Sequence, residues 1–270
     1  MRVEGRHISA VPVYRPSDCP VEDLSPKRIR DIGDHSNLQT QNQQLETHNM
    51  NASLQYIIFD LDDTLYPRSS GVMQEIGRRI QQWLQQTFDL SPEEASAMRR
   101  RYFLRYGTTL AGLMAANAQD IDVDDYLFFV HDIPVETYLD PSPALDRMLW
   151  AIPLSKAVYT NATSTYARRV LRALDVIVHF EHVIGIEDVG MHSKADRRAY
   201  ERALEILGVP GSACIMVEDT LQNLEQAKAL GMTTILVDGQ PDGHVDVAVD
   251  DLLKVGEVIE DLLNGRRPAL

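Results

Sequence analysis

The chain has 270 residues, of which 44% are hydrophobic, and its formal net charge at pH 7 is −14. This length is enough for one α/β domain with a smaller attached domain, so disulfide bonds are not needed for stability. The acidic charge repels polyanions, which argues against a nucleic-acid polymer or an anionic membrane as a partner, whereas a small anionic metabolite is compatible if a metal ion offsets the field.

The sequence carries no sign of secretion or membrane insertion. No stretch approaches the roughly 20 apolar residues that span a bilayer, and the N-terminal region lacks the apolar centre of a secretory signal. Cys19 lies in a polar segment and Cys214 in an apolar run, so we expect no native bridge between them. We therefore expect a soluble, cytoplasmic protein.

Residues 1–52 show neither helical nor strand periodicity, and they end in a polar run rich in Asn and Gln. Such a segment is typical of a disordered, solvated tail. Met50 directly precedes the first apolar run, so a start of translation at this residue is an alternative that the sequence leaves open.

From residue 56 onward, short apolar runs alternate with helical patterns. The runs cover residues 56–59, 157–159, 183–186, 214–217 and 234–237. Buried parallel strands read as continuous apolar runs, so this alternation predicts a doubly wound, Rossmann-like parallel sheet built from residues 53–68 and 141–270. Helix ends are readable as well, with Thr163 as an N-cap and with Gly208 and Gly231 closing two helices.

Residues 69–140 form an insertion that is too long for a simple crossover. Ser91, Pro92 and Glu94 combine an N-cap, a proline in the first turn and a capping box, and apolar stripes indicate four helices in all. We expect a small helical cap domain, inserted after the first strand, that closes over the sheet as a mobile lid.

Polar side chains stand where the predicted strands end. Asp60 and Asp62 follow the first strand, Thr160 and Asn161 the second, Lys194 comes after the third, and Glu218 with Asp219 ends the fourth. In extended geometry Asp60 and Asp62 point to the same side and Asp63 points away. Taken singly, the acids are as easily turn or helix caps and the lysine a solvated side chain. Their shared placement at the carboxyl ends of parallel strands favours one functional crevice.

The segments 60–64, 160–161, 194 and 218–219 resemble the four sequence motifs of the haloacid dehalogenase (HAD) superfamily. Residues 66–67, 106–109 and 223–231 further resemble its pyrimidine 5′-nucleotidase-like branch. One departure concerns the motif lysine, which relatives usually follow with Pro-x-Pro. Ala195-Asp196-Arg197 stands there instead, so a less rigid lysine loop is expected.

The resemblance implies a magnesium-dependent phosphatase. Asp60 would attack phosphorus and form an aspartyl-phosphate, and Asp62 would act first as general acid and then as general base. Mg²⁺ would be bound by Asp60, Asp219 and the backbone carbonyl of Asp62, with Glu218 binding directly or through water. Thr160, Asn161 and Lys194 would hold the phosphoryl oxygens, and the lysine would also stabilise charge in the transition state.

The implied substrates are small phosphate monoesters, with pyrimidine nucleoside monophosphates such as UMP and CMP ahead of purine nucleotides. A sugar phosphomutase and a phosphoglycolate-type phosphatase remain alternatives, as does a catalytically inactive binding or regulatory protein on the same fold. A dehalogenase is disfavoured because a departing halide needs no acid such as Asp62. The sequence leaves the oligomeric state open.

Overall fold

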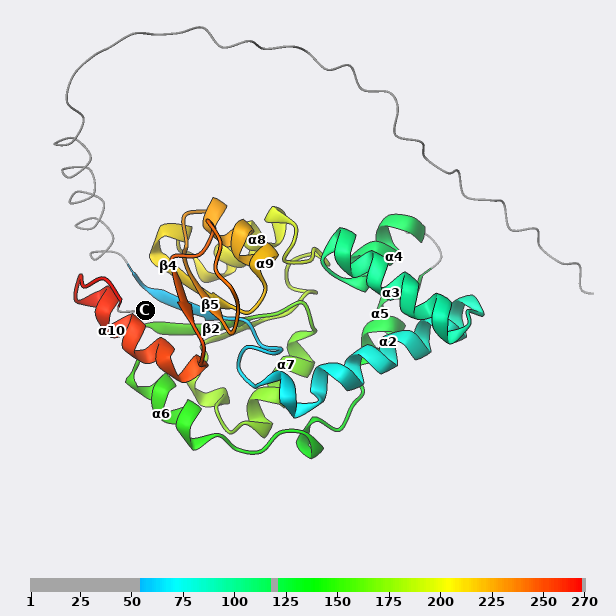
Figure 1. Ribbon diagram of the computed structural model, residues 1–270, viewed down its shortest axis with the longest axis horizontal. Coiled ribbons are helices and arrows are strands. Elements are labelled where there is room, and N and C mark those ends of the chain that lie inside the picture. The colour runs from blue at the N-terminus through cyan, green and yellow to red at the C-terminus, as the bar shows by residue number, and fades with distance from the viewer. Residues whose placement is uncertain (1–53, 118–120, 269–270) are drawn as a thin grey trace, which may run out of the picture.

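The computed structural model describes residues 54–117 and 121–268, so the expected tail at residues 1–52 lies outside the described residues. The core is a parallel sheet in the order β3-β2-β1-β4-β5-β6 (Figure 1). Its strands are β1 (Tyr56–Phe59), β2 (Ser155–Tyr159), β3 (His182–Ile184), β4 (Cys214–Glu218), β5 (Thr233–Val237) and β6 (Val247–Val249). The predicted doubly wound parallel sheet is confirmed, and β6 adds an edge strand that was not predicted.

The register brings the ends of three strands together. Phe59, the last residue of β1, pairs with Val158 of β2 on one side and with Val217 of β4 on the other. The chain order reverses between β1 and β4, and ligands of open α/β sheets bind outside the carboxyl ends of the strands at such a switch point. Residues that follow β1, β2 and β4 therefore share one crevice.

Alternate strand residues face two different helical layers. Ile57 and Phe59 pack in a core with α6 (Pro143–Ala151), α7 (Ser164–Ala173) and α10 (Val255–Leu263). Ile58, between them, packs in a second core with α8 (Arg197–Leu207) and α9 (Leu221–Ala229). Both faces of the sheet are thus covered, which explains why the strands read as continuous apolar runs.

The insertion after β1 folds as four helices, α2 (Val72–Phe88), α3 (Pro92–Tyr106), α4 (Thr109–Asn117) and α5 (Val123–His131). They enclose a third apolar core around Trp83, Leu84 and Leu113. Figure 1 shows this helical cap beyond the carboxyl ends of the strands. The expected cap inserted after the first strand is therefore present in the fold.

The local signals for helix ends correspond to the observed caps. The Ser91 hydroxyl accepts a hydrogen bond from the Glu94 N–H, and the Glu94 carboxylate accepts one from the Ser91 N–H, which completes the capping box before α3. The Thr163 hydroxyl caps α7 by accepting a hydrogen bond from the Tyr166 N–H, and Gly208 ends α8 with a φ of 69°. Short 3₁₀ turns link the helices and strands at Arg68–Ser70, Val135–Thr137, Ile177–His179, Gly211–Ala213 and Leu252–Lys254.

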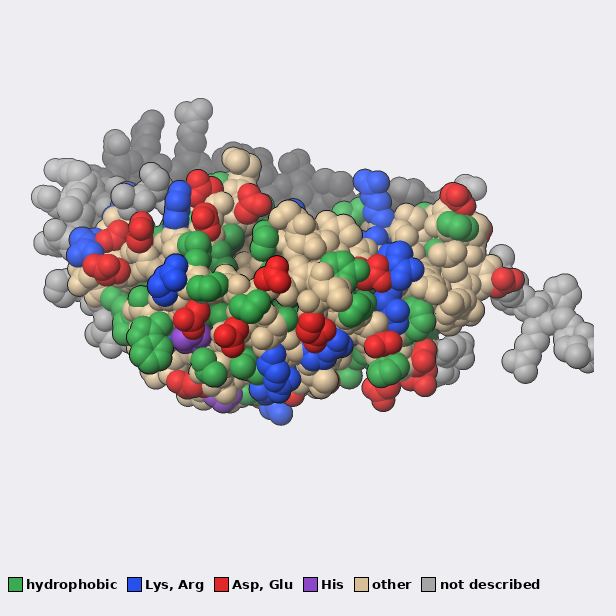
Figure 2. Space-filling model, turned by 90° about the horizontal axis from the view of Figure 1, so that it is seen from below, with side chains coloured by type: hydrophobic (Ala, Val, Ile, Leu, Met, Phe, Trp, Pro, Cys, Tyr) green, Lys and Arg blue, Asp and Glu red, His purple; other side chains and the backbone are tan. Residues whose placement is uncertain are grey.

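The described surface carries charges of both signs, and Cys214 lies in the interior. Acidic and basic side chains are interspersed on the face shown in Figure 2. Among the described helices, none has both the length and the apolar character needed to cross a bilayer. Cys214 is buried as a free thiol whose sulfur lies 3.7 Å from the carbonyl oxygen of Pro210.

Candidate active site

Three carboxylates meet where β1 and β4 end. Asp60 follows β1 and its backbone N–H donates to the carbonyl of Val217, while Glu218 ends β4 and Asp219 follows it. Each of these three acids offers an oxygen, and all three oxygens lie within 4.8 Å of one another. Asp60 and Glu218 are buried, so their charges lie in a region of low dielectric constant.

Lys194 is the cation that faces this cluster. The side chain is fully buried, with its Nζ 2.5 Å from Asp60 Oδ1 and 2.9 Å from Glu218 Oε2. Burial alone lowers the pKa of Lys194, but the charges of Asp60 and Glu218 outweigh it and raise that pKa above its usual value. The ammonium group is therefore charged, and it neutralises part of the acidic cluster.

Lys194, even together with Arg68 beside Asp219, does not balance three acids. Burial raises the pKa of Asp60 and raises the pKa of Glu218 well above its usual value, although Lys194 acts in the opposite direction on both. Carboxylate oxygens held this closely are the ligands that Mg²⁺ prefers, and no sulfur or imidazole takes part. The donor set and the excess negative charge therefore fit a magnesium ion, with Asp60, Glu218 and Asp219 as the side chains that would hold it.

Asp62 is turned away from this cluster toward two tyrosines. Its Oδ1 accepts hydrogen bonds from the hydroxyls of Tyr66 and Tyr166, the second at 3.1 Å. Its Oδ2 lies 3.4 Å from the hydroxyl of Thr160. Burial, and then the charge of Asp60, raises the pKa of Asp62 to about 7. A carboxyl group with a pKa of about 7 is partly protonated at near-neutral pH and can therefore both give and take a proton there.

The expectation that Asp63 points away from the crevice is wrong. β1 ends at Phe59, and Asp63 has a φ of 62°, so the chain turns and the alternation of an extended strand does not apply. Asp63 lines the same cavity as Asp60, and its buried Oδ1 has no hydrogen-bond partner among the residues that the structure describes. Burial, followed by the charge of Asp219, raises the pKa of Asp63 to about 6. Arg68 provides a partial counter-charge, 2.5 Å from Asp219 and 3.8 Å from Asp63.

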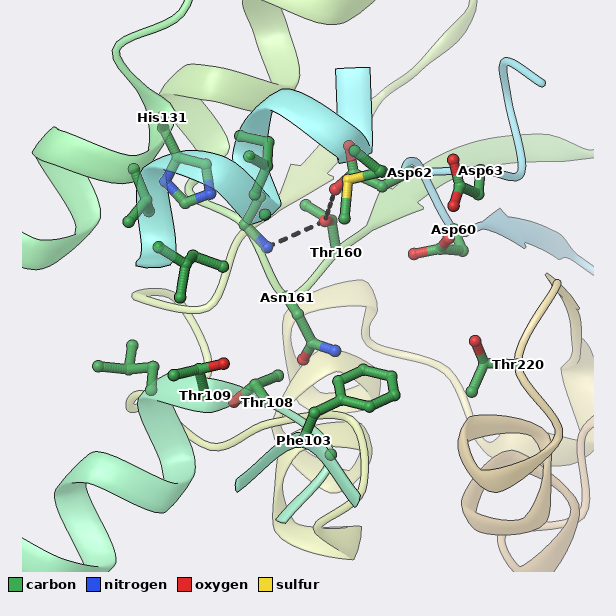
Figure 3. A pocket seen from close by; sticks show the side chains of 18 of the residues that line it. Asp60, Asp62, Asp63, Phe103, Thr108, Thr109, His131, Thr160, Asn161 and Thr220 are labelled. Atoms are coloured by element: carbon green, nitrogen blue, oxygen red, sulfur yellow. Dashed lines mark hydrogen bonds between the residues drawn. The ribbon is translucent and has the colours of Figure 1, made fainter. Parts of the chain in front are cut away.

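Thr160 and Asn161 reach the crevice from the end of β2 (Figure 3). The Thr160 hydroxyl accepts a hydrogen bond from the Ala162 N–H and donates to Asp62. The Asn161 side-chain oxygen accepts from the backbone N–H of Lys194 at 2.8 Å. The structure thus brings all seven sequence-predicted residues to one place, with Asn161 bracing the lysine segment.

The lysine segment also touches the cap. The Ser193 hydroxyl donates to the carbonyl of Tyr106 at 3.0 Å. Next to it, Gly107 lies so close to Ala195 that an ideal Cβ on the glycine would be 2.6 Å from the Cβ of Ala195. These contacts tie the lysine segment to the cap, and the looser lysine loop expected from the missing prolines stays a prediction.

A cavity of about 380 Å³ extends from the aspartates into the cap. Its cap side is mostly apolar, and its lining there includes Met73, Ile76, Ile80, Phe103, Leu110, Leu127 and Val130. Figure 3 shows the Phe103 ring and His131 on this side, opposite the aspartates. Sequence reasoning did not select Phe103 or Tyr166 as site residues, because an aromatic residue in a helical pattern is read as packing. Tyr66 entered only through the resemblance of residues 66–67 to the nucleotidase-like branch.

Residues 54–231 match the family model of the haloacid dehalogenase-like hydrolases. The match spans more than half of the chain and includes every residue of the site described above. The chain therefore belongs to the haloacid dehalogenase-like hydrolase family.

Individual relatives are distant. The chain is 25% identical over 210 residues to phosphate metabolism protein 8 of Saccharomyces cerevisiae, a match that covers 72% of this chain but 61% of the yeast protein, so the chain spans less than two thirds of that relative. It is 26% identical over 207 residues to phosphoglycolate phosphatase of Mesorhizobium japonicum, covering 70% of this chain and 85% of that protein. The crystal structure of a HAD phosphatase from Thermococcus onnurineus superposes with a TM-score of 0.53 at 19% identity, covering 80% of this chain and all of that one, which supports the fold.

Proposed function

We propose that this protein is a magnesium-dependent phosphatase that hydrolyses small phosphate monoesters through a phosphorylated Asp60. The observation that carries the proposal is the pairing of two aspartates in different environments. Asp60 lies among the carboxylates that could hold a metal ion and beside Lys194, whereas Asp62 has a pKa of about 7 and is held by hydroxyl groups. One carboxylate is therefore suited to attack and the other to carry a proton.

In the proposed reaction Asp60 attacks phosphorus as the bond to the leaving oxygen breaks. Asp62 gives its proton to that oxygen, so that the product leaves as a neutral alcohol. Asp62, now a carboxylate, takes a proton from the water that attacks phospho-Asp60. Phosphate is released, and the free Asp60 carboxylate is regenerated. Bound Mg²⁺ supplies charge neutralisation for the phosphoryl group. Lys194 and Thr160 assist as donors to phosphoryl oxygens.

The size of the cavity supports a metabolite as substrate. A volume of about 380 Å³ lies near the lower end of the roughly 300–1,000 Å³ that is typical of small-molecule sites. The cap, which we assign to residues 69–140, supplies most of the apolar wall over the leaving group. A folded phosphoprotein would not fit beneath it unless the cap opened widely.

Within this class we propose pyrimidine nucleoside monophosphates as the preferred substrates. Phe103 lines the cavity and is 54% exposed, so it offers an aromatic face on which a planar base can stack. A purine needs more room in the same cavity, and a poor fit of this kind costs about 1–3 kcal/mol. The second candidate is a phosphoglycolate-type phosphatase, favoured by the named Mesorhizobium relative.

A phosphate-release screen with purified protein and Mg²⁺ tests both levels of the proposal. The panel contains UMP, CMP, AMP, GMP, hexose phosphates and phosphoglycolate, with Asp60→Asn as the control variant. We expect UMP and CMP to have the highest kcat/KM and the variant to release no phosphate and form no base-labile phosphoenzyme. A tenfold preference for phosphoglycolate or a hexose phosphate would replace the nucleotide assignment. Full activity of Asp60→Asn would overturn the phosphatase mechanism itself.

A further inference from the structure

Asp62 is held by two phenols that come from different parts of the chain. Tyr66 lies four residues beyond Asp62 in the segment that leads to the cap, and Tyr166 lies in the first turn of α7. Both side chains are buried, and both hydroxyls donate to the same carboxyl oxygen, Oδ1. We call these two residues the tyrosine pair.

The tyrosine pair makes the two oxygens of Asp62 inequivalent. A carboxyl oxygen has two lone pairs, and the two phenols occupy both of those on Oδ1. Within the described part of the chain, Oδ2 has one hydrogen-bond partner, the Thr160 hydroxyl at 3.4 Å, on the side where β2 ends and the cavity begins. A proton on the Asp62 carboxyl is therefore confined to Oδ2.

We propose that Tyr66 and Tyr166 are positioning residues that fix Asp62 so that Oδ2 is its proton-transfer atom. This inference rests on the proposed phosphatase function. As the bond between phosphorus and the leaving oxygen breaks, the proton on Oδ2 passes to that oxygen and Asp62 becomes a carboxylate. When water attacks phospho-Asp60, Oδ2 takes one proton from the water, and the cycle is complete.

The cap contributes to the same arrangement. The His131 ring, at the end of α5, packs against the ring of Tyr166 with 4.8 Å between centroids. His131 is oriented in turn by its Nδ1, which donates to the carbonyl of Leu127 at 2.9 Å. Tyr166 is thus held between the core and the cap, and the orientation of Asp62 depends on both.

The loss of kcat/KM expected when the tyrosine pair is removed can be estimated from the rate enhancement that a general acid provides. Such an acid typically contributes about 10²- to 10⁴-fold, and misplacing a catalytic group by about 1 Å costs roughly 10²-fold. Without the phenols, the Asp62 side chain has other staggered rotamers open to it. We expect each single Tyr→Phe change to lower general-acid catalysis roughly 10-fold and the double change roughly 100-fold.

The test compares two leaving groups. One substrate is the best alkyl phosphate from the screen, whose alkoxide needs a proton, and the other is 2,4-dinitrophenyl phosphate, whose phenolate leaves without one. The quantity is kcat/KM, which covers only the steps up to loss of the leaving group. The variants are Tyr66→Phe, Tyr166→Phe and both together, with Asp62→Asn as the upper limit of the effect. Tyr200→Phe is the matched control, because its hydroxyl is buried and has no hydrogen-bond partner among residues 54–117 and 121–268.

We expect the tyrosine variants to lose kcat/KM on the alkyl ester roughly 10- to 100-fold but less than about 3-fold on the dinitrophenyl ester, with Tyr200→Phe unchanged on both. The ratio of the two kcat/KM values does not depend on the fraction of folded enzyme, so a poorly folding variant still gives an answer. Equal losses on both esters, or no loss on either, would overturn the positioning role alone. Wild-type protein that releases phosphate from neither ester would overturn the proposed function as well.

Discussion

Replacing Lys194 by methionine should destabilise the metal-free protein, and Mg²⁺ should restore stability to the variant without restoring its activity. Lys194 is fully buried and bridges Asp60 and Glu218, so the change leaves two buried carboxylates without their cation. Methionine has a similar length and no charge, and it therefore tests the ion pairs more than the packing. The loss of stability should be largest in protein without a metal ion, because no divalent cation then balances the acids.

The magnitude follows from the geometry. At the observed distances each ion pair is worth about 6 kcal/mol with an effective dielectric constant of about 20. The cost of burying the charges offsets much of this, and breaking a buried pair typically costs about 3–5 kcal/mol. Because one lysine serves two carboxylates, we expect a loss near 5 kcal/mol. For a domain of this size this corresponds to a Tm roughly 10–20 °C lower.

The assay is chemical denaturation with and without Mg²⁺, alongside phosphate release. A ligand that binds only the folded state stabilises it by about 2.7 kcal/mol at 100 times its Kd. Mg²⁺ should stabilise Lys194→Met more than wild type, since the variant lacks the competing ammonium group. Phosphate release should remain absent. Lys156→Met is the control, because this buried lysine donates to the backbone carbonyls of Ile152 and Leu154 instead of to carboxylates.

Two results would refute this reasoning about charge. The first is a free energy of unfolding for metal-free Lys194→Met that lies within about 1 kcal/mol of the wild-type value. This difference is smaller than the cost of breaking a single buried pair. The second is an equal loss in Lys194→Met and Lys156→Met that Mg²⁺ leaves unchanged in both. Either result would mean that the lysine only fills space.

Three further predictions concern the metal, the acid and the cap. Chelation should abolish phosphate release and added Mg²⁺ should restore it; activity that survives exhaustive metal removal would contradict the assignment. The pKa of Asp62 is raised to about 7, so its ionisation costs stability, and metal-free wild type should lose stability relative to Asp62→Asn as the pH rises from about 4 to about 7; parallel unfolding curves would contradict the shift. Both Gly107 and Gly208 have positive φ, but an added Cβ would meet Ala195 at Gly107, whereas at Gly208 it would meet nothing within 4 Å among the described residues. Gly107→Ala should therefore destabilise by more than the roughly 1–3 kcal/mol of backbone strain expected for Gly208→Ala, and it should raise KM; equal effects would remove the cap contact from the explanation.

Local signals were sufficient to predict most of the fold. The capping box at Ser91 and Glu94 and the N-cap at Thr163 depend on a few neighbouring residues, and both form as predicted. Strand ends were less exact. The third strand was expected to continue to Ile186, but it ends at Ile184 because the Gly185 N–H leaves the ladder and donates to Asp188.

Contacts between distant segments could not be predicted in this way. Tyr166 is 104 residues from Asp62, and its place on an apolar helical face indicates packing with no sign of its hydroxyl partner. The edge strand β6 has three residues, too few for a reliable pattern. The site residues themselves were found because a parallel sheet gathers its strand ends at one edge, a consequence of topology that needs no side-chain detail.

The charges of the crevice limit how Lys194 can take part in the reaction. The cavity is lined by Asp60, Asp62, Asp63, Glu218 and Asp219. Lys194 and Arg68 pair with acids of this group, and Arg99 lines the cavity from the cap. Lys194 already binds two carboxylates and Arg68 binds Asp219, so a dianionic phosphoryl group would meet a net negative site. A divalent cation on the carboxylates offsets most of this negative charge and weakens the hold of Asp60 and Glu218 on the lysine. Metal and substrate should therefore bind in that order, with the ammonium group available to phosphate only after the metal has bound.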